Sequence, residues 1–295
     1  MLHAIAQAGN SGARILLVHV IRPASLRRSF DPEPDSVITS SRVAAAWDVL
    51  NQTARMVEAH GIPCEPLALE GDPLQLVPKV AEARHADRVI VATRGTRGIQ
   101  RVLARSVAEA LIASVMVPVC VIGPHVVAGP FVHSRGGKVL LALSLSHREI
   151  SHLRIAAELA LGRDARLVLL HVLDSWGMDD AHRKSASASA EEALRQMILE
   201  AGLAARNPEV VVREGSPVHV LLADDLSSSQ DLMVMGVPFQ SRISHLLDAG
   251  IVHEVIAGTR CPVITLRVPE SQKGIDNAVS IVYDSEGFQQ SPSRT

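Results

Sequence analysis

Residues 87–122 read DRVIVATRGTRGIQRVLARSVAEALIASVMVPVCVI, and this segment predicts the architecture of the whole chain. Residues 88–93 form a short β-branched, apolar run without polar alternation, which is typical of a strand covered on both faces of a parallel sheet. Two glycines follow, Gly95 and Gly98, and the apolar residues after them recur at the three-and-four spacing of a helix with one buried face. Residues 117–122 predict a second strand. Together these elements make a crossover unit, in which the backbone N–H groups at the start of the helix commonly bind phosphate.

Composition limits the class of protein. At 295 residues, 47% of them hydrophobic, the chain is long enough for two domains with a core each. Aromatic residues make up only 2%, and 29 basic side chains are balanced by 31 acidic ones, so we expect no nucleic-acid partner. No run approaches a membrane span and no signal sequence opens the chain, so we expect no membrane attachment. Cys64, Cys120 and Cys261 lack metal-ligand spacing, which favours reduced thiols in the cytoplasm.

Two copies of one α/β unit make up the chain. The strand ARILLVHV at residues 13–20 returns as ARLVLLHV at residues 165–172, an offset of 165 − 13 = 152. The turn EGDP at residues 70–73 returns as EGSP at residues 214–217, an offset of 214 − 70 = 144. We therefore predict one domain over residues 1–126, a second over residues 127–268, and a linker and tail over residues 269–295.

The two copies differ at their start. The second copy opens with a strand at residues 138–143 and a helix before its ARLVLLHV, whereas the first begins inside that helix and lacks the strand. The tail contains an isolated apolar segment, AVSIVYD, at residues 278–284. We predict that this segment returns to complete the sheet of the first domain, as in a circular permutant. Two alternatives stay open: a third repeat cut short, with the tail disordered, or exchange of the strand between two chains.

Several histidines are candidates for chemistry, but their places favour structural roles. His19 and His171 lie at matching positions on the two predicted ARILLVHV-type strands. We expect both to be packed and hydrogen-bonded rather than catalytic. His147 and His152 lie in a polar stretch that predicts a solvated helix, and no glycine-flanked nucleophile accompanies them. We expect Cys120, in an apolar strand, to be buried and inert.

These residues resemble the universal stress protein family, here as a tandem of two copies. The family signature places a glycine, then a second glycine, then a third glycine followed by a hydroxyl residue after the fourth strand. In the first copy Gly95 and Ser106 match, whereas Ala92 and Arg105 replace the first and third glycines. In the second copy Gly236 matches the first glycine, but the later positions do not fit. The resemblance implies an α/β fold of two flavodoxin-like (Rossmann-like) open parallel sheets, arranged as a pseudo-two-fold pair.

The resemblance also implies where a nucleotide would bind. Family members that bind ATP carry an aspartate at the end of the first strand. In the first copy Asp284 takes this position if the tail closes the first sheet. In the second copy the position is occupied by Ser144. The resemblance therefore implies one site, in the first copy, for ATP or another adenine nucleotide, with Mg²⁺ left open. That site consists of Gly95, Gly98, Arg105, Ser106 and Asp284. The structural alternative is that the glycines only permit a tight turn and that the arginines around them are solvated.

The resemblance implies a cytoplasmic stress-response protein in which the nucleotide acts as a sensor or switch. No general base, metal cluster or nucleophile stands at recognisable spacing, so we expect no catalytic residue, no metal site and at most slow ATP hydrolysis. One alternative is a protein-interaction module that binds no nucleotide. Another is an enzyme related to the adenine-nucleotide α-hydrolases, which is disfavoured because their SGGxDS-type loop is absent. The protein partner is unidentified, and a homodimer is left open.

Overall fold

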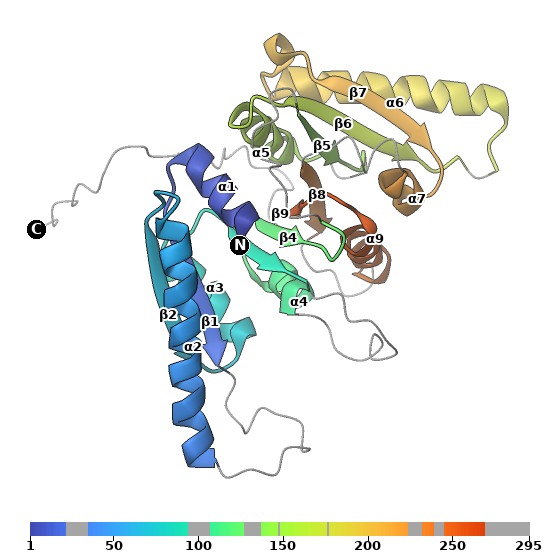
Figure 1. Ribbon diagram of the computed structural model, residues 1–295. Helices are drawn as coiled ribbons and strands as arrows, with labels where there is room; N and C mark the ends of the chain where they lie inside the picture. Colours follow the sequence, from blue (N-terminus) through green and yellow to red (C-terminus); the bar gives the residue numbers. More distant parts are fainter. Residues whose placement is uncertain are drawn as a thin grey trace, which may run out of the picture.

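The computed structural model describes residues 1–21, 35–93, 107–126, 137–146, 148–175, 177–223, 232–238 and 245–268, without the side chains of residues 10, 35–40, 238, 245–249 and 268. Within these ranges helices cover both faces of largely parallel sheets (Figure 1).

The second half is a complete open sheet of five parallel strands. In chain order its elements are β5 (Lys138–Ala142), α5 (Ile150–Leu161), β6 (Arg166–Leu173), α6 (Asp180–Glu200), the 3-10 helix η3 (Ala204–Arg206), β7 (Glu209–Glu214), α7 (Pro217–Leu222), β8 (Leu232–Pro238), α9 (His245–Gly258) and β9 (Val263–Val268). The spatial order is β9-β8-β5-β6-β7. With β5 as the first strand this reads 5-4-1-2-3, so the strand order reverses between β5 and β8.

Among its described residues the first half repeats this layout without a counterpart of β5. Its elements are α1 (Leu2–Ser11), β1 (Ile15–Ile21), α2 (Asp35–Glu58), β2 (Cys64–Glu70), α3 (Pro73–Ala83), β3 (Val89–Ala92), α4 (Val107–Ser114) and β4 (Val119–Ile122). β1 and β2 form a separate two-stranded sheet, whereas β3 pairs with β4. Among the described residues nothing is hydrogen-bonded between β1 and β3, the place that β5 occupies in the second half. Residues 278–284 lie outside the described residues, so their closure of this sheet stays a prediction.

The two halves join edge to edge through β4 and β9. These strands pair antiparallel, with Cys120 opposite Ile264, and the seven strands from β3 to β7 become one sheet. Because 120 + 144 = 264, the two facing residues are equivalent positions of the repeat, and the pseudo-two-fold axis passes between them. Glu109 of α4 and His253 of α9 are also equivalent, since 109 + 144 = 253, and the Nδ1 of His253 lies 2.6 Å from a carboxylate oxygen of Glu109 across the same axis.

The core is shared by both halves. On one face α5 and α6 pack against β5 to β9, and Cys120 of the first half belongs to the same cluster. On the other face α4, α7 and α9 pack on strands from both halves, with Val121 and Met233 fully buried. The predicted α/β fold, with two open parallel sheets in a pseudo-two-fold pair, is confirmed. Cys120 is buried as predicted, and burial raises the pKa of its thiol.

Candidate functional site

Ligands of open α/β sheets bind beyond the carboxyl ends of the strands, where the strand order reverses. In the second half that place lies between β5 and β8. In the first half it lies between β1 and β3, whose described carboxyl ends are Ile21 and Ala92. The five predicted nucleotide-binding residues all lie outside the described residues, and their roles stay predictions; they are Gly95, Gly98, Arg105, Ser106 and Asp284.

The structure does describe the two ends of the glycine loop. Thr93 follows β3, and its backbone N–H donates to the carbonyl of Ile122 at 3.0 Å, which fixes the exit from the strand. The helix that receives the loop is described from Val107, with Glu109 in its first turn. Residues 94–106 therefore connect the carboxyl end of β3 to the start of α4. This is the strand-to-helix connection in which backbone N–H groups meet an anion.

A second loop at the same edge is built from the turn EGDP. The N–H of Gly71 donates to the carbonyl of Ile21 at 3.0 Å, so the loop after β2 is tied to the end of β1. Gly71 has φ +147°, where an L side chain is strained. Asp72 then caps α3 by accepting from the N–H of Leu74 at 3.0 Å, and Pro73 begins the helix. The loop after β2 is thus held by a backbone hydrogen bond to β1 and by the cap of α3.

In the second half a histidine occupies the equivalent edge. His152, in the first turn of α5, is buried with 7% of its surface exposed, so the prediction of a solvated helix is wrong for this residue. Its ring lies against Gly236 near the end of β8, where an added Cβ would come within 2.9 Å of it. Within the described residues its Nε2 atom has no hydrogen-bond partner. Burial lowers the pKa of His152 to about 4, and a hydrogen bond to the backbone of Arg267 acts in the opposite direction.

The contact between Gly236 and His152 predicts a coupled pair of substitutions. Gly236→Ala should lower the free energy of unfolding by about 2 kcal/mol, because the buried ring has little room to move. In a His152→Ala background the same substitution should cost markedly less, which a double-mutant cycle by chemical denaturation would measure. Gly162→Ala is the control, since its nearest described atom would be at 3.5 Å. Equal costs in both backgrounds would contradict the assignment of the clash.

The two matching histidines have different environments. His171 on β6 is partly buried, and its Nδ1 lies 3.1 Å from the carbonyl oxygen of Leu143, the residue that follows β5. His19 on β1 is exposed. The prediction that both are packed and hydrogen-bonded is therefore confirmed for His171 and wrong for His19. The partner of His171 directly follows β5, a strand with no counterpart among the described residues of the first half.

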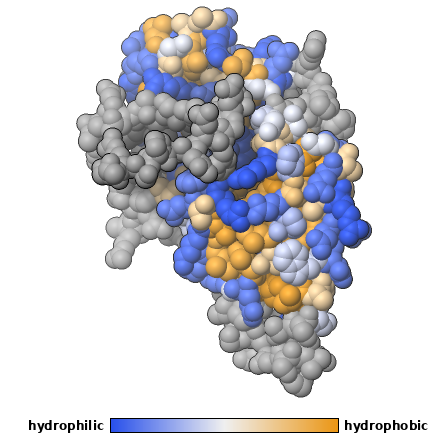
Figure 2. All heavy atoms as spheres, turned by 90° about the vertical axis from the view of Figure 1, so that its left-hand side faces the viewer, coloured by the Kyte–Doolittle hydropathy of each residue, from blue (hydrophilic) through white to orange (hydrophobic). Residues whose placement is uncertain are grey.

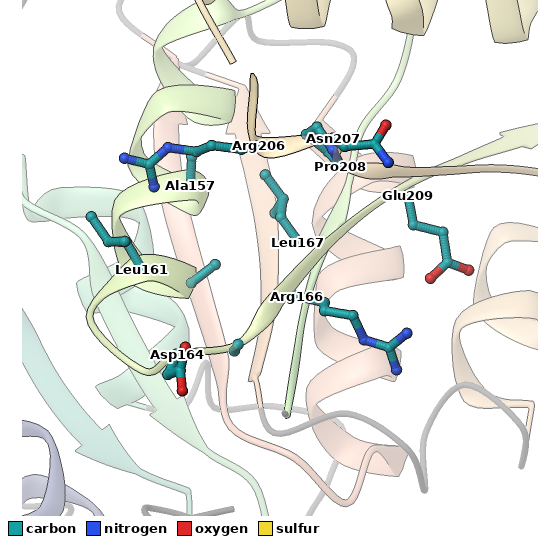
Figure 3. A pocket seen from close by; sticks show the side chains of 11 residues that line it. Ala157, Leu161, Asp164, Arg166, Leu167, Arg206, Asn207, Pro208 and Glu209 are labelled. Carbon is teal, nitrogen blue, oxygen red and sulfur yellow. The ribbon is translucent and has the colours of Figure 1, made fainter. Parts of the chain in front are cut away.

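The described part of the chain also has an open hollow of about 670 Å³ at the opposite, amino edge of the second half. It is lined by the end of α5, the start of β6 and the loop before β7. Figure 3 shows that the charged ends of Asp164, Arg166, Arg206 and Glu209 point in different directions rather than toward one point. A binding site usually has a few convergent polar groups, so this hollow is not a favoured candidate.

The described residues contain neither a metal cluster nor a membrane-spanning helix. No group of three or more histidine, cysteine or carboxylate side chains within them could hold a metal ion. None of the described helices combines the length and apolar character that a membrane crossing needs.

Comparison with known proteins identifies the repeat. The model of the universal stress protein family matches residues 1–123 and again residues 137–267. The chain belongs to the universal stress protein family. Among curated proteins, universal stress protein MJ0531 of Methanocaldococcus jannaschii is 33% identical over 75 residues, which are 25% of this chain and 44% of that protein. The chain thus spans less than half the length of this curated relative.

Solved universal stress proteins share the fold over both halves. One from Archaeoglobus fulgidus covers 91% of this chain and 91% of its own, with a TM-score of 0.67 and 22% identity. A putative universal stress protein from Pseudomonas aeruginosa covers 88% of this chain and 95% of its own, with a TM-score of 0.57 and 15% identity. At these identities the likeness shows the fold alone.

Proposed function

We propose that the first half of this universal stress protein binds one adenine nucleotide and that this binding acts as a sensor or switch in a cytoplasmic stress response. The observation that carries the proposal is the difference between the two carboxyl edges. In the second half the buried ring of His152 packs against Gly236 at the carboxyl edge, between β5 and β8. In the first half Ala92 takes the position of Gly236, since 236 − 144 = 92, and Ala92 is exposed in the described structure.

Charge and backbone direction at the first edge suit a nucleotide phosphate. In sequence, residues 94–106 precede α4, and the dipole and N–H groups at the start of a helix generally favour an anion. The sequence of this loop carries four arginines, whereas residues 238–250 of the second half carry one, Arg242. In the proposal Gly95 and Gly98 let the backbone approach the phosphate, Ser106 and Arg105 contact it, and Asp284 holds the nucleoside.

Isothermal titration with ATP and with AMP tests this proposal. One site per chain is expected, and Asp284→Ala should weaken binding by at least about tenfold, the loss of one hydrogen bond to a charged group. Ser144→Ala, at the equivalent position of the second half, is the matched control and should leave the affinity unchanged. Absence of heat with folded wild-type protein, or equal affinity in Asp284→Ala, would contradict the proposal.

A second candidate function is a protein-interaction module, and an exposed apolar surface favours it. Figure 2 shows hydrophobic surface on the part of the molecule that carries α2 and the β1–β2 pair. On α2, Val49 is 58% exposed, Met56 41% and Trp47 38%. Exposed apolar patches of this kind often mark contacts with other proteins. This candidate takes precedence if titration detects no nucleotide.

A further inference from the structure

The sheet of the first half is split, and helices on both faces hold the two parts together. On one face Gln7 of α1 accepts from the guanidinium of Arg88 at 2.9 Å, and its amide lies 3.4 Å from the sulfur of Cys120. On the other face α3 contacts β1, and its Leu74 and Val77 pack in the cluster that contains α4 and β3. Figure 1 shows α1 lying across from the β1–β2 pair toward β4. The split therefore separates the β1–β2 pair from β3 and β4, and α1 and α3 contact strands on both sides of it.

The strands beside the split are less buried than their counterparts. Residues 167–170 of β6 are buried, whereas the equivalent residues 15–18 of β1 are only partly buried. Residues 232–235 of β8 are buried, whereas residues 89–91 of β3 are again only partly buried. In the second half β5 lies between β6 and β8 and covers the facing edge of each. Apolar strands with one open edge are costly in water, so a strand is expected in the split.

We propose that residues 278–284 of the same chain insert between β1 and β3 as a parallel strand and complete the sheet of the first half. The direction of the chain supports this occupant. β9 runs antiparallel to β4, with Thr265 opposite Val119, so the chain leaves β9 beside the amino ends of β4 and β3. Arg267, whose guanidinium lies 3.4 Å from the sulfur of Met116, marks this position. A strand parallel to β1 and β3 must begin at this amino edge.

The linker is long enough to reach the split. From β9 the chain must pass β4 and β3, which is three strand spacings or about 14 Å. Residues 269–277 are nine residues, and an extended chain of that length spans about 30 Å. The inserted strand would end at the carboxyl edge, where α1 begins, so the two termini would lie at the same edge of the sheet.

The repeat offsets set the register of the inserted strand. In the second half Leu141 of β5 faces Leu169 of β6 and Val234 of β8. The first-half equivalents of these neighbours are 169 − 152 = 17 and 234 − 144 = 90, which are Leu17 and Ile90.

Placing Asp284 at the position of Ser144, an offset of 140, puts Ile281 at the position of Leu141. Ile281 would then lie between β1 and β3, with Val279 and Val282 taking the places of Val139 and Ala142. The same offset puts Tyr283 at the position of Leu143.

The exposed histidine of β1 supports this register. His171 reaches the carbonyl of Leu143 at the end of β5. In the completed first half the carbonyl of Tyr283 would stand at the same place beside His19. An inserted strand thus supplies the hydrogen-bond acceptor that the matching histidine has in the second half.

Hydrogen exchange of the full chain, measured by mass spectrometry without nucleotide, tests the insertion. Ile281→Pro removes a strand N–H and should raise exchange in β1 and β3 by about 100-fold or more, while β6 and β8 stay protected. A chain that ends at Val268 should show the same local loss. Gln290→Pro, a proline in the tail beyond the proposed strand, is the matched control and should leave exchange unchanged.

Three results would overturn the insertion. One is unchanged exchange in β1 and β3 after Ile281→Pro and after truncation. Another is a loss of protection spread equally over β6 and β8. The third is protection that is present only in a dimer and vanishes in the isolated monomer, which would assign the strand to a second copy. Because no nucleotide is present, a failed titration with ATP would leave this test unaffected.

Discussion

Replacing Gly123 by alanine should lower the free energy of unfolding by about 3 kcal/mol, the upper end of the usual cost of overpacking a core. Gly123 follows β4 and is buried, and an added Cβ would clash with the backbone carbonyl oxygen of Ile256 in α9. A backbone atom cannot rotate away as the end of a side chain can. To remove the clash, α9 must move relative to β4. That movement would loosen the contact between the two halves.

Gly250→Ala is the matched control for this prediction because Gly250 lies in α9 as well. No described atom would lie within 4 Å of its added Cβ. Alanine is the better helix former, so this variant should be as stable as the wild type or more stable by up to about 1 kcal/mol. Urea unfolding of the three proteins measures the difference. A Gly123→Ala protein as stable as Gly250→Ala would show that the contact between β4 and α9 is looser than described.

The stability of the protein should fall as the pH drops from about 6.5 to about 4, with His152 contributing about 3 kcal/mol of the loss. The pKa of His152 is lowered in the folded state, so in this window the unfolded chain binds a proton that the folded chain does not. The contribution is fully present above pH 6.5 and is lost as the pH falls toward the folded-state pKa.

The comparison of His152→Leu with the wild type isolates this contribution, because carboxylates also titrate in the window. The leucine variant should lose less stability between pH 7 and pH 4.5, as measured by urea unfolding at each pH. His219→Gln, at an exposed position, should follow the wild-type profile. Parallel curves for His152→Leu and the wild type would contradict a neutral, buried ring at the edge between α5 and β8.

Local patterns predicted most of the elements because their signals are short-range. The run at residues 88–93 and the segment at residues 117–122 became the parallel pair β3 and β4. Asp72 and Pro73 begin α3 as the turn EGDP predicts. The prediction that His152 lies on a solvated helix was wrong, because burial depends on which residues pack against the helix. Here the contact comes from Gly236, in a strand far along the chain.

The candidate site was predicted only in part. Motif spacing located the loop between β3 and α4, and the described ends agree with a strand-to-helix connection. The role of His152 as the side chain that fills the second edge could not be predicted, since nothing nearby in sequence marks it. A possible signal was the helix spacing of His152 with the buried Ala156, which places both on one face.

The sequence by itself determined that one α/β unit is present twice, because repeats and periodicity are written in residue order. Only the tertiary structure decided that the two sheets fuse through β4 and β9 about an axis at Cys120 and Ile264. Pairing between edge strands depends on which edges are free once each half has folded. The structure adds that, among the described residues, β1 and β3 belong to separate sheets, since an open edge is a property of the assembled sheet.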